Sequence, residues 1–158
     1  MSQKSKIRIM IVDDHAIIRS GLRMLISTQP DMEVVAEATD GTQVLKKVKE
    51  TKPDVCLLDI TMPRAGGMPA LQDIVQNCPE TKAILFTMHE DPVCLRSALS
   101  AGASGYMLKK TGEKELLAAI KAVYSGKIFV DPSLPVPLPR SSSRNGVHIL
   151  PLSSPYKS

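Results

Sequence analysis

The stretch Ile7-Arg8-Ile9-Met10-Ile11-Val12-Asp13-Asp14 places a mainly apolar, β-branched run directly before two adjacent carboxylates. Runs of this composition favour strands. Four more runs of the same kind lie at Met32–Ala38, Asp54–Leu58, Lys82–Phe86 and Ser104–Leu108. After each run, apolar residues recur every three or four positions, as they do on one face of a helix. This alternation, repeated five times, predicts an α/β fold in which a parallel sheet carries helices on both faces.

Residues at the ends of the predicted helices fit this order. Asp40 and Thr111 are predicted N-cap residues, because their side-chain oxygens can accept hydrogen bonds from free backbone N–H groups. Gly102 and Gly126 follow the fourth and fifth helical stretches, at the position where glycine commonly ends a helix.

Composition narrows the classes of protein to which the chain can belong. It has 158 residues and a formal net charge of +4 without a basic run, which gives little support for nucleic-acid binding. It contains no apolar run long enough to cross a bilayer, so no membrane association is predicted. The three cysteines, Cys56, Cys78 and Cys94, lack CxxC spacing and predict free thiols in a reducing cytoplasm.

Ligands of open parallel sheets bind at the carboxyl ends of the strands, so the residues after each run are the candidates for chemistry. Four of the five runs end in a polar side chain: Asp13 and Asp14, Asp59, Thr87 and Lys109. The second run ends at Glu37 and Ala38, without a group predicted to react. The sequence therefore predicts that side chains far apart along the chain gather at one edge of the sheet.

The residue types in this set indicate phosphoryl chemistry assisted by a divalent cation. Three crowded carboxylates repel one another unless a cation joins them, and oxygen ligands suit Mg²⁺. A carboxylate can attack phosphorus and form an acyl phosphate. The ammonium group of Lys109 and the hydroxyl group of Thr87 can then stabilise charge on the phosphoryl oxygens. His15 is interpreted as a loop residue, because Mg²⁺ prefers oxygen.

Each residue also has an ordinary structural interpretation. Asp13 and Asp14 could cap the first helix. Taken alone, Asp59 is a loop carboxylate, Thr87 ends a strand, and Lys109 is a solvated charge. Their shared position at the ends of four strands is what favours a functional site.

Four segments of the sequence resemble the receiver domain of bacterial response regulators. They are Val12–His15, Leu58–Pro63, Thr87–His89 and Gly102–Lys109. The resemblance runs from about Lys6 to Pro132 and is greatest to the subfamily whose receiver domain precedes a LuxR-type helix-turn-helix. It implies a flavodoxin-like (βα)5 three-layer sandwich with the strand order 2-1-3-4-5.

The resemblance also implies a role for each residue at the sheet edge. Asp59 would be the phosphoacceptor, and Lys109 would contact the phosphoryl group. Mg²⁺ would be bound by Asp13, Asp14, Asp59 and the backbone carbonyl of Thr61.

Thr87 and Tyr106 match the switch pair of the family, in which the hydroxyl closes on the phosphoryl group and the aromatic ring turns inward. The alternative for Tyr106 is a half-buried aromatic residue of a strand. A sensor histidine kinase is the implied phosphoryl donor. The domain would be a switch rather than an enzyme, although it would assist its own phosphorylation and dephosphorylation.

The composition of the sequence changes at Asp131. We predict a receiver domain over residues 1–130 and a disordered tail over residues 131–158, which contains 6 Pro and 7 Ser in 28 residues. Such a tail is too short for a helix-turn-helix domain. The chain is then either a truncated product or a single-domain regulator. DNA binding is expected only through a domain missing from this chain, in a longer parent that regulates transcription. Homodimer formation is left open.

Two other functions compete with the switch. A phosphatase of the haloacid-dehalogenase type would also form an aspartyl phosphate, but it needs a second carboxylate two residues after the nucleophile, where this chain has Thr61. The third interpretation is a binding or DNA-regulating module that acts without phosphorylation. Salt-dependent DNA binding would favour that module.

Overall fold

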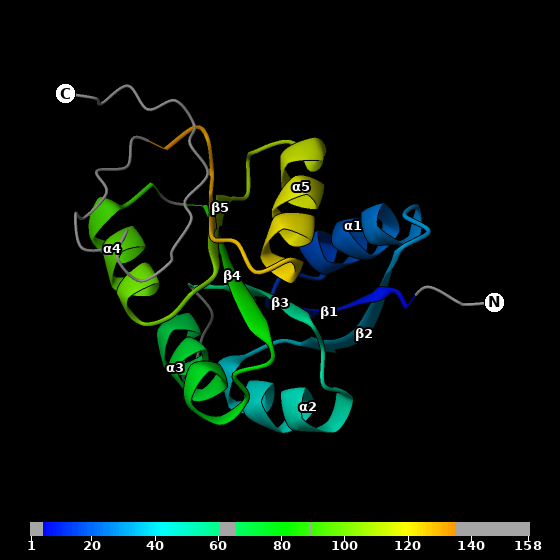
Figure 1. The fold of residues 1–158 in the computed structure, drawn as a ribbon, viewed down its shortest axis with the longest axis horizontal. Helices are drawn as coiled ribbons and strands as arrows, with labels where there is room; N and C mark the ends of the chain where they lie inside the picture. The colour runs from blue at the N-terminus through cyan, green and yellow to red at the C-terminus, as the bar shows by residue number, and fades with distance from the viewer. Residues whose placement is uncertain (1–4, 61–65, 89, 135–158) are drawn as a thin grey trace.

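A parallel sheet of six strands in the order β2-β1-β3-β4-β5-β6 forms the centre of the molecule (Figure 1). The structure is a computed structural model that describes residues 5–60, 66–88 and 90–134. The strands are β1 (Ile7–Val12), β2 (Met32–Ala38), β3 (Val55–Asp59), β4 (Lys82–Thr87), β5 (Gly105–Leu108) and β6 (Phe129–Val130). The helices are α1 (Ala16–Ser27), α2 (Val44–Thr51), α3 (Gly67–Asn77), α4 (Pro92–Ser100) and α5 (Glu113–Tyr124), with a 3₁₀ turn, η1, at Gly41–Gln43.

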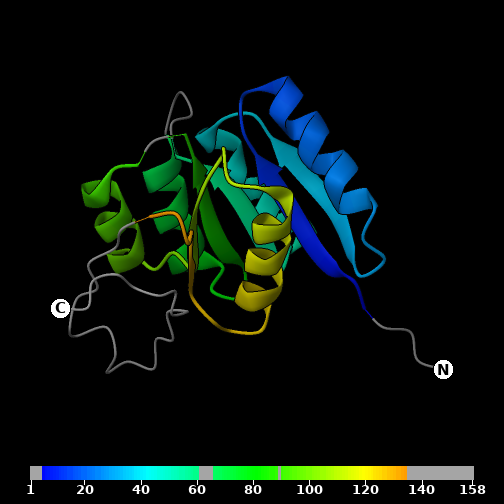
Figure 2. The ribbon, with the colours of Figure 1, turned by 90° about the horizontal axis from the view of Figure 1, so that it is seen from above.

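Two layers of helices cover the sheet. Helices α1 and α5 pack on one face, and α2, α3 and α4 pack on the other, each over its own cluster of buried apolar side chains (Figure 1). Seen from above, α1 and α5 lie in front of the sheet (Figure 2). The predicted three-layer sandwich and its strand order are confirmed. Among the described residues, every helix is too short or too polar to span a lipid bilayer.

The helices form where an apolar stripe meets suitable end residues. In α5, Leu116, Ile120 and Val123 are buried at helical spacing. Acidic residues occupy its first turn, where their negative charge interacts favourably with the helix dipole. Gly102 and Gly126 have positive φ angles of 106° and 99° after α4 and α5, a conformation that suits glycine.

One predicted helix end is confirmed and one is wrong. The side chain of Asp40 accepts a hydrogen bond from Thr42 N and caps η1. Thr111 is not the N-cap of α5; that residue is Gly112. The hydroxyl group of Thr111 donates instead to the carboxylate of Asp131, a distant partner that local sequence does not reveal.

The sixth strand extends the predicted five. Phe129 and Val130 pair in parallel with Gly105 and Tyr106 of β5, and two residues are too few to show a strand pattern. Asp131, at the start of the predicted tail, is buried in the structure. The prediction for the rest of the tail stays a prediction, because residues 135–158 lie outside the described part of the chain.

The Asp131 carboxylate ties the end of β5 to the chain that follows β6. It accepts from the backbone N–H of Leu108 at 2.8 Å and from the hydroxyl group of Thr111. It also accepts from the backbone N–H and the hydroxyl group of Ser133, at 2.9 and 2.7 Å. Leu134 then packs against the core.

Replacement of Asp131 should therefore destabilise the fold. Asp131→Ala removes an acceptor of four hydrogen bonds and leaves the buried N–H of Leu108 without its partner. We expect the free energy of unfolding to fall by about 2–4 kcal/mol, as measured by urea unfolding. Asp73→Ala, on the exposed surface of α3, is the matched control and should unfold like the wild type. Equal stability of the two variants would contradict the assigned role of Asp131.

Candidate functional site

The register of the strands aligns the carboxyl ends of β1, β3, β4 and β5. Val12 of β1 lies opposite Leu58 of β3, and Asp59 lies opposite Phe86 of β4. Thr87 in turn lies opposite Leu108 of β5. Because each strand stops at about the same level, the residue after β1 meets the last residue of β3 and the residue after β5. The sheet thus gathers the predicted side chains at one edge.

Lys109 lies between two buried carboxylates. Its Nζ atom is 2.6 Å from Asp13 Oδ2 and 3.2 Å from Asp59 Oδ2. The side chains of all three residues are almost fully buried, with exposures of 4% or less. The backbone N–H of Lys109 donates to the carbonyl oxygen of Thr87 at 2.7 Å, which holds the start of the loop after β5 against the end of β4.

Asp14 and His15 complete the cluster on its solvent side. Asp13 Oδ1 accepts from the backbone N–H of His15 at 2.8 Å and lies 2.7 Å from His15 Nδ1. The same Nδ1 atom lies 3.3 Å from Asp14 Oδ1. One ligand atom from each of Asp13, Asp14, His15 and Asp59 lies within 4.8 Å of the others.

This geometry tests two interpretations made from the sequence, namely that Asp13 or Asp14 caps the first helix and that His15 is a loop residue. The N-cap residue of α1 is His15, without a side-chain cap, so neither Asp13 nor Asp14 is the N-cap of that helix. His15 lies in the loop before α1, as interpreted, and its ring contacts both acidic side chains. The sequence offered only its position beside two carboxylates as a signal.

The donor set fits a small divalent cation with a preference for oxygen. Asp13 Oδ2 is buried and accepts no hydrogen bond from the described residues, although the ammonium group of Lys109 lies at ion-pair distance. Three carboxylates and one ammonium group leave a formal charge of two negative units, which one divalent cation would balance. Thr61, the fourth predicted ligand, lies outside the described residues.

Glycine is required where the backbone of α3 approaches Asp59. A Cβ atom on Gly67 would lie 2.4 Å from Ile60 Cα and 2.6 Å from the carbonyl oxygen of Asp59. Gly66, the N-cap of α3, has a φ of 61°. The two glycines thus allow the start of α3 to pack directly on the backbone of Asp59.

Thr87 and Tyr106 lie on the neighbouring strands β4 and β5. Both side chains are buried. Thr87 is the last residue of β4, and Tyr106 of β5 lies opposite Leu85 of β4. The ring of Tyr106 belongs to the core cluster beneath α4, so it points inward in this structure and is not half-buried. Burial, aided by nearby Cys94 and Asp91, raises the pKa of the Tyr106 phenol to about 12.

Comparison with known proteins identifies the family to which this edge of acidic and basic residues belongs. The family model for the response regulator receiver domain matches residues 9–121. The chain belongs to the response regulator receiver family. NreC, an oxygen regulatory protein of Staphylococcus aureus, is 45% identical over 128 residues, which cover 80% of this chain and 59% of NreC.

Solved receiver structures have the same fold. A two-component response regulator of the LuxR family from Aurantimonas sp. SI85-9A1 is 42% identical, with a TM-score of 0.74 over 77% of this chain and 87% of that one. The isolated REC domain of RcsB from Salmonella enterica serovar Typhimurium, solved in the presence of phosphomimetic BeF3-, is 26% identical. Its TM-score is 0.74, over 89% of this chain and 98% of that domain. The predicted flavodoxin-like receiver fold and its relation to LuxR-family regulators are confirmed.

Receiver domains form a signalling family, not a family of turnover enzymes. This chain spans only 59% of the length of NreC. The family model and the relatives thus identify the receiver domain.

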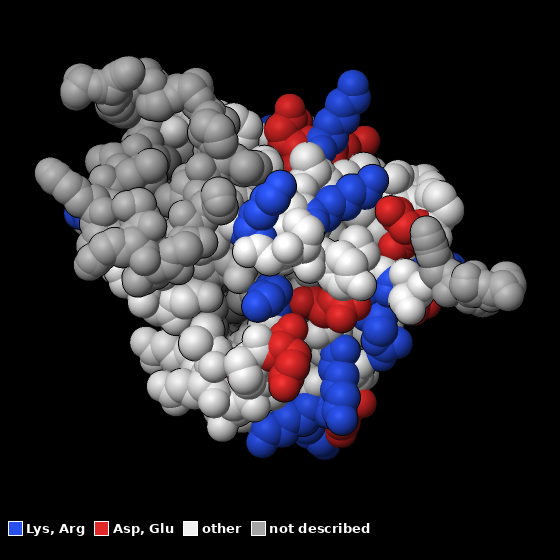
Figure 3. Space-filling model, viewed as in Figure 1, with Lys and Arg blue, Asp and Glu red and all other residues white. Residues whose placement is uncertain are grey.

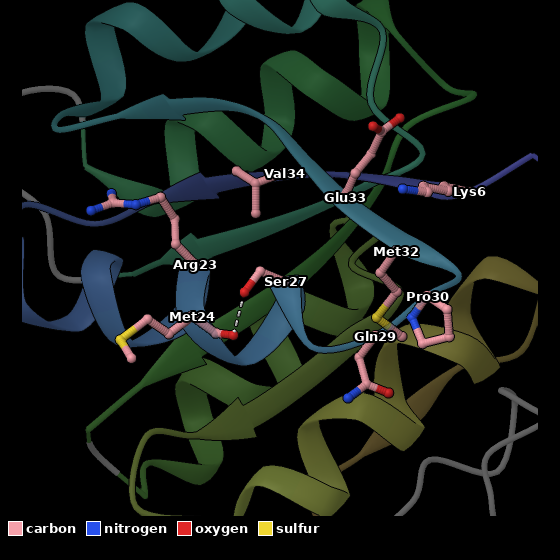
Figure 4. A pocket seen from close by; sticks show the side chains of 9 residues that line it. All are labelled: Lys6, Arg23, Met24, Ser27, Gln29, Pro30, Met32, Glu33 and Val34. Carbon is pink, nitrogen blue, oxygen red and sulfur yellow. Dashed lines mark hydrogen bonds between the residues drawn. The ribbon is translucent and has the colours of Figure 1, made fainter.

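The receiver has a separate hollow of about 530 Å³ between α1 and β2 (Figure 4). Lys6 and Met32 lie at the amino ends of β1 and β2, so this pocket extends away from the carboxylates. Its one carboxylate, Glu33, lies 3.8 Å from Arg8. On the face shown in Figure 3, basic and acidic side chains are interspersed outside the grey region. Neither this pocket nor the surface in Figure 3 gathers several buried carboxylates around an ammonium group, as the cluster does.

The close approach at Gly67 predicts an unequal effect of two glycine-to-alanine replacements. Gly67→Ala forces the backbone of Asp59 and Ile60 to move and should lower the free energy of unfolding by about 1–3 kcal/mol. Gly21→Ala, in α1, meets no atom within 4 Å and should stabilise the fold by about 0.5–1 kcal/mol. Urea unfolding measures both. A Gly67→Ala variant as stable as Gly21→Ala would rule out the tight packing.

The raised pKa of Tyr106 predicts a loss of stability in alkali. Its folded-state pKa of about 12 exceeds the ordinary value of 10, so the stability that this phenol contributes is complete below pH 10 and falls as the pH rises toward 12. Urea unfolding across this range should show a steeper fall for the wild type than for Tyr106→Phe. Tyr124→Phe, at a half-exposed position, should keep the steep fall. Identical slopes for the wild type and Tyr106→Phe would contradict the burial of the phenol.

Proposed function

We propose that Asp59 accepts a phosphoryl group from the phosphohistidine of a sensor histidine kinase, at a Mg²⁺ site formed by Asp13, Asp14, Asp59 and the backbone carbonyl of Thr61. The observation that supports this proposal most strongly is the buried cluster in which Lys109 lies between the carboxylates of Asp13 and Asp59. Membership of the receiver family supports the same roles.

The proposed reaction transfers one phosphoryl group between two protein side chains. A carboxylate oxygen of Asp59 forms a bond to phosphorus while the P–N bond to the donor imidazole breaks, and the imidazole keeps the electron pair. When bound, Mg²⁺ stabilises charge on the phosphoryl oxygens. Asp59 needs no general base, because its carboxylate has no proton to lose before it attacks.

Lys109 and Thr87 stabilise the phosphorylated form in this proposal. The ammonium group of Lys109 already lies 3.2 Å from Asp59, so it can contact a phosphoryl oxygen after a small movement. Thr87, at the end of β4, supplies a hydroxyl donor from the neighbouring strand. The same side chains would serve the hydrolysis of the aspartyl phosphate, which resets the switch.

Tyr106 connects this chemistry to an output. Movement of Thr87 toward the phosphoryl group changes the space beside the ring of Tyr106, beneath α4. We infer that the surface formed by α4, β5 and α5 passes this change on. In a longer parent protein in the cytoplasm, the recipient would be a helix-turn-helix domain that binds DNA and regulates transcription.

Intact mass spectrometry tests the phosphoacceptor. The protein is incubated with acetyl phosphate and Mg²⁺, which removes the need for the cognate kinase. We expect one added phosphoryl group on the wild type, none on Asp59→Asn, and none on the wild type with EDTA. Asp73→Asn, at an exposed position on α3, is the control and should be labelled like the wild type.

Two outcomes would reject the assignment of Asp59. Full labelling of Asp59→Asn would place the phosphoryl group elsewhere. Absence of labelling in the wild type, repeated with a phosphorylated histidine kinase as donor, would mean that the cluster is only structural.

A further inference from the structure

Arg19 reaches from α1 to the backbone of the turn that carries the acidic pair. Its Nη1 atom donates to the carbonyl oxygen of Asp13 at 2.8 Å. Its Nε atom donates to Glu37 Oε1, at the end of β2, at 3.2 Å. The Arg19 side chain is only 18% exposed, so it bridges two strand ends from a partly buried position rather than extending into solvent.

The bond from Arg19 fixes the peptide group that joins Asp13 to Asp14. The N–H of Asp13 is held by the carbonyl oxygen of Ala38 at 3.1 Å, and the C=O of Asp13 is held by Arg19. Because a peptide group is planar, the direction of this C=O also sets the position of Asp14 Cα. Arg19 therefore helps to set the position of Asp14 Cα, from which the Asp14 side chain leaves the backbone.

Asp14 needs such control more than Asp13 does. Asp13 is buried and contacts both Lys109 and His15. The side chain of Asp14 is 36% exposed, and its ion-pair contact among the described residues is with His15, at 3.3 Å. A half-exposed carboxylate with so few contacts depends on its backbone for orientation.

Glu37 is anchored well enough to orient Arg19. Lys47 of α2 donates to the carbonyl oxygen of Glu37 at 2.6 Å. Arg23, one helical turn beyond Arg19, donates to both carboxylate oxygens of Glu37 at 2.8 Å each. Glu37 thus has its backbone held from one helix and its side chain held from another.

We propose that Arg19 is a positioning residue for the divalent cation, which it serves by fixing the Asp13–Asp14 peptide and thereby aiming the Asp14 carboxylate, with Glu37 as its anchor. This inference rests on the proposed cation site of the phosphoacceptor. It assigns a function to the end of β2, the strand end at which the sequence shows no reactive group.

Positioning and simple charge repulsion predict opposite results when Arg19 is replaced. A positive charge near a cation site weakens cation binding, so loss of the charge alone should tighten binding. Loss of the positioning bond should weaken binding, because groups that orient metal ligands typically contribute about tenfold or more to affinity. The sign of the change therefore separates the two effects.

The experiment is isothermal titration calorimetry of the full chain with Mn²⁺ as the probe cation. Arg19→Met keeps an unbranched stem but loses every donor, and we expect it to bind Mn²⁺ about tenfold more weakly than the wild type. Arg23→Met is the matched control. It removes the same charge and two hydrogen bonds to Glu37, but Arg23, which lines the separate pocket in Figure 4, donates no hydrogen bond to Asp13. Arg23→Met should therefore lose less affinity for Mn²⁺ than Arg19→Met does.

Two further variants keep the test decisive if Arg19→Met folds poorly. Glu37→Gln keeps Arg19 itself but removes the charge of its anchor, and it should weaken Mn²⁺ binding by less than Arg19→Met does. Arg19→Lys keeps the charge and one donor group, and it should recover part of the lost affinity. Urea unfolding of each variant shows whether the change in affinity occurs without loss of the fold.

A second readout uses the rate of labelling by acetyl phosphate as a function of Mg²⁺ concentration. In Arg19→Met, the Mg²⁺ concentration that gives half of the maximal rate should rise about tenfold, while the rate at saturating Mg²⁺ should stay near that of the wild type. A loss of rate that Mg²⁺ cannot restore would indicate a structural defect and overturn the proposal.

The outcomes also separate this proposal from the assignment of the phosphoacceptor. If the wild type binds Mn²⁺ but is not labelled, the proposed function fails and calorimetry still decides the role of Arg19. Equal or tighter binding by Arg19→Met than by Arg23→Met would overturn the positioning role. Absence of Mn²⁺ binding by the wild type would overturn it as well.

Discussion

Two buried carboxylates share one buried ammonium group at the carboxyl edge of the sheet, and the local structure follows from that constraint. A buried charge is costly unless it is paired, so Asp13, Asp59 and Lys109 must be brought together as the strands align. The pairing is incomplete in charge, because one ammonium group faces two carboxylates and Asp14 adds a third nearby. A fold that tolerates this excess negative charge is suited to a divalent cation and to the oxygens of a phosphoryl group.

Each part of the cluster depends on a backbone contact from outside it. The turn after β1 is held by Arg19, the residue after β3 lies against Gly67, and the end of β5 is held by Asp131 and the carbonyl oxygen of Thr87. These contacts come from α1, from the start of α3, from the end of β4 and from the chain after β6. The side chains of the proposed site are few, and each of the surrounding turns is held by a different contact.

Sequence reasoning located the strand ends because strand composition and helical spacing are local patterns. Asp59 and Lys109 could be placed at one edge of the sheet for that reason. Glu37 ends a strand by the same criterion, but its ion pairs with Arg19 and Arg23 depend on the packing of α1 beside β2, which no local pattern encodes. The structural role of Asp131 could not be predicted for a different reason. Asp131 stands where the composition becomes rich in Pro and Ser, although its carboxylate is buried against β5.

The short length of β5 matters for the proposed switch, because the strand contains Tyr106 and is followed directly by Lys109. Lys109, which contacts Asp59, and Tyr106, which lies in the core beneath α4, are separated by only two residues. One of these, Leu108, donates its backbone N–H to Asp131, and the N–H of Asp131 donates to the carbonyl oxygen of Tyr106. A displacement of Lys109 toward a phosphoryl group would therefore act on one short hydrogen-bonded segment. That segment includes Tyr106, the aromatic residue of the proposed switch, and the start of the chain that leaves the sheet. In the proposed switch, β5 would therefore link the phosphoryl chemistry to the output without a long pathway.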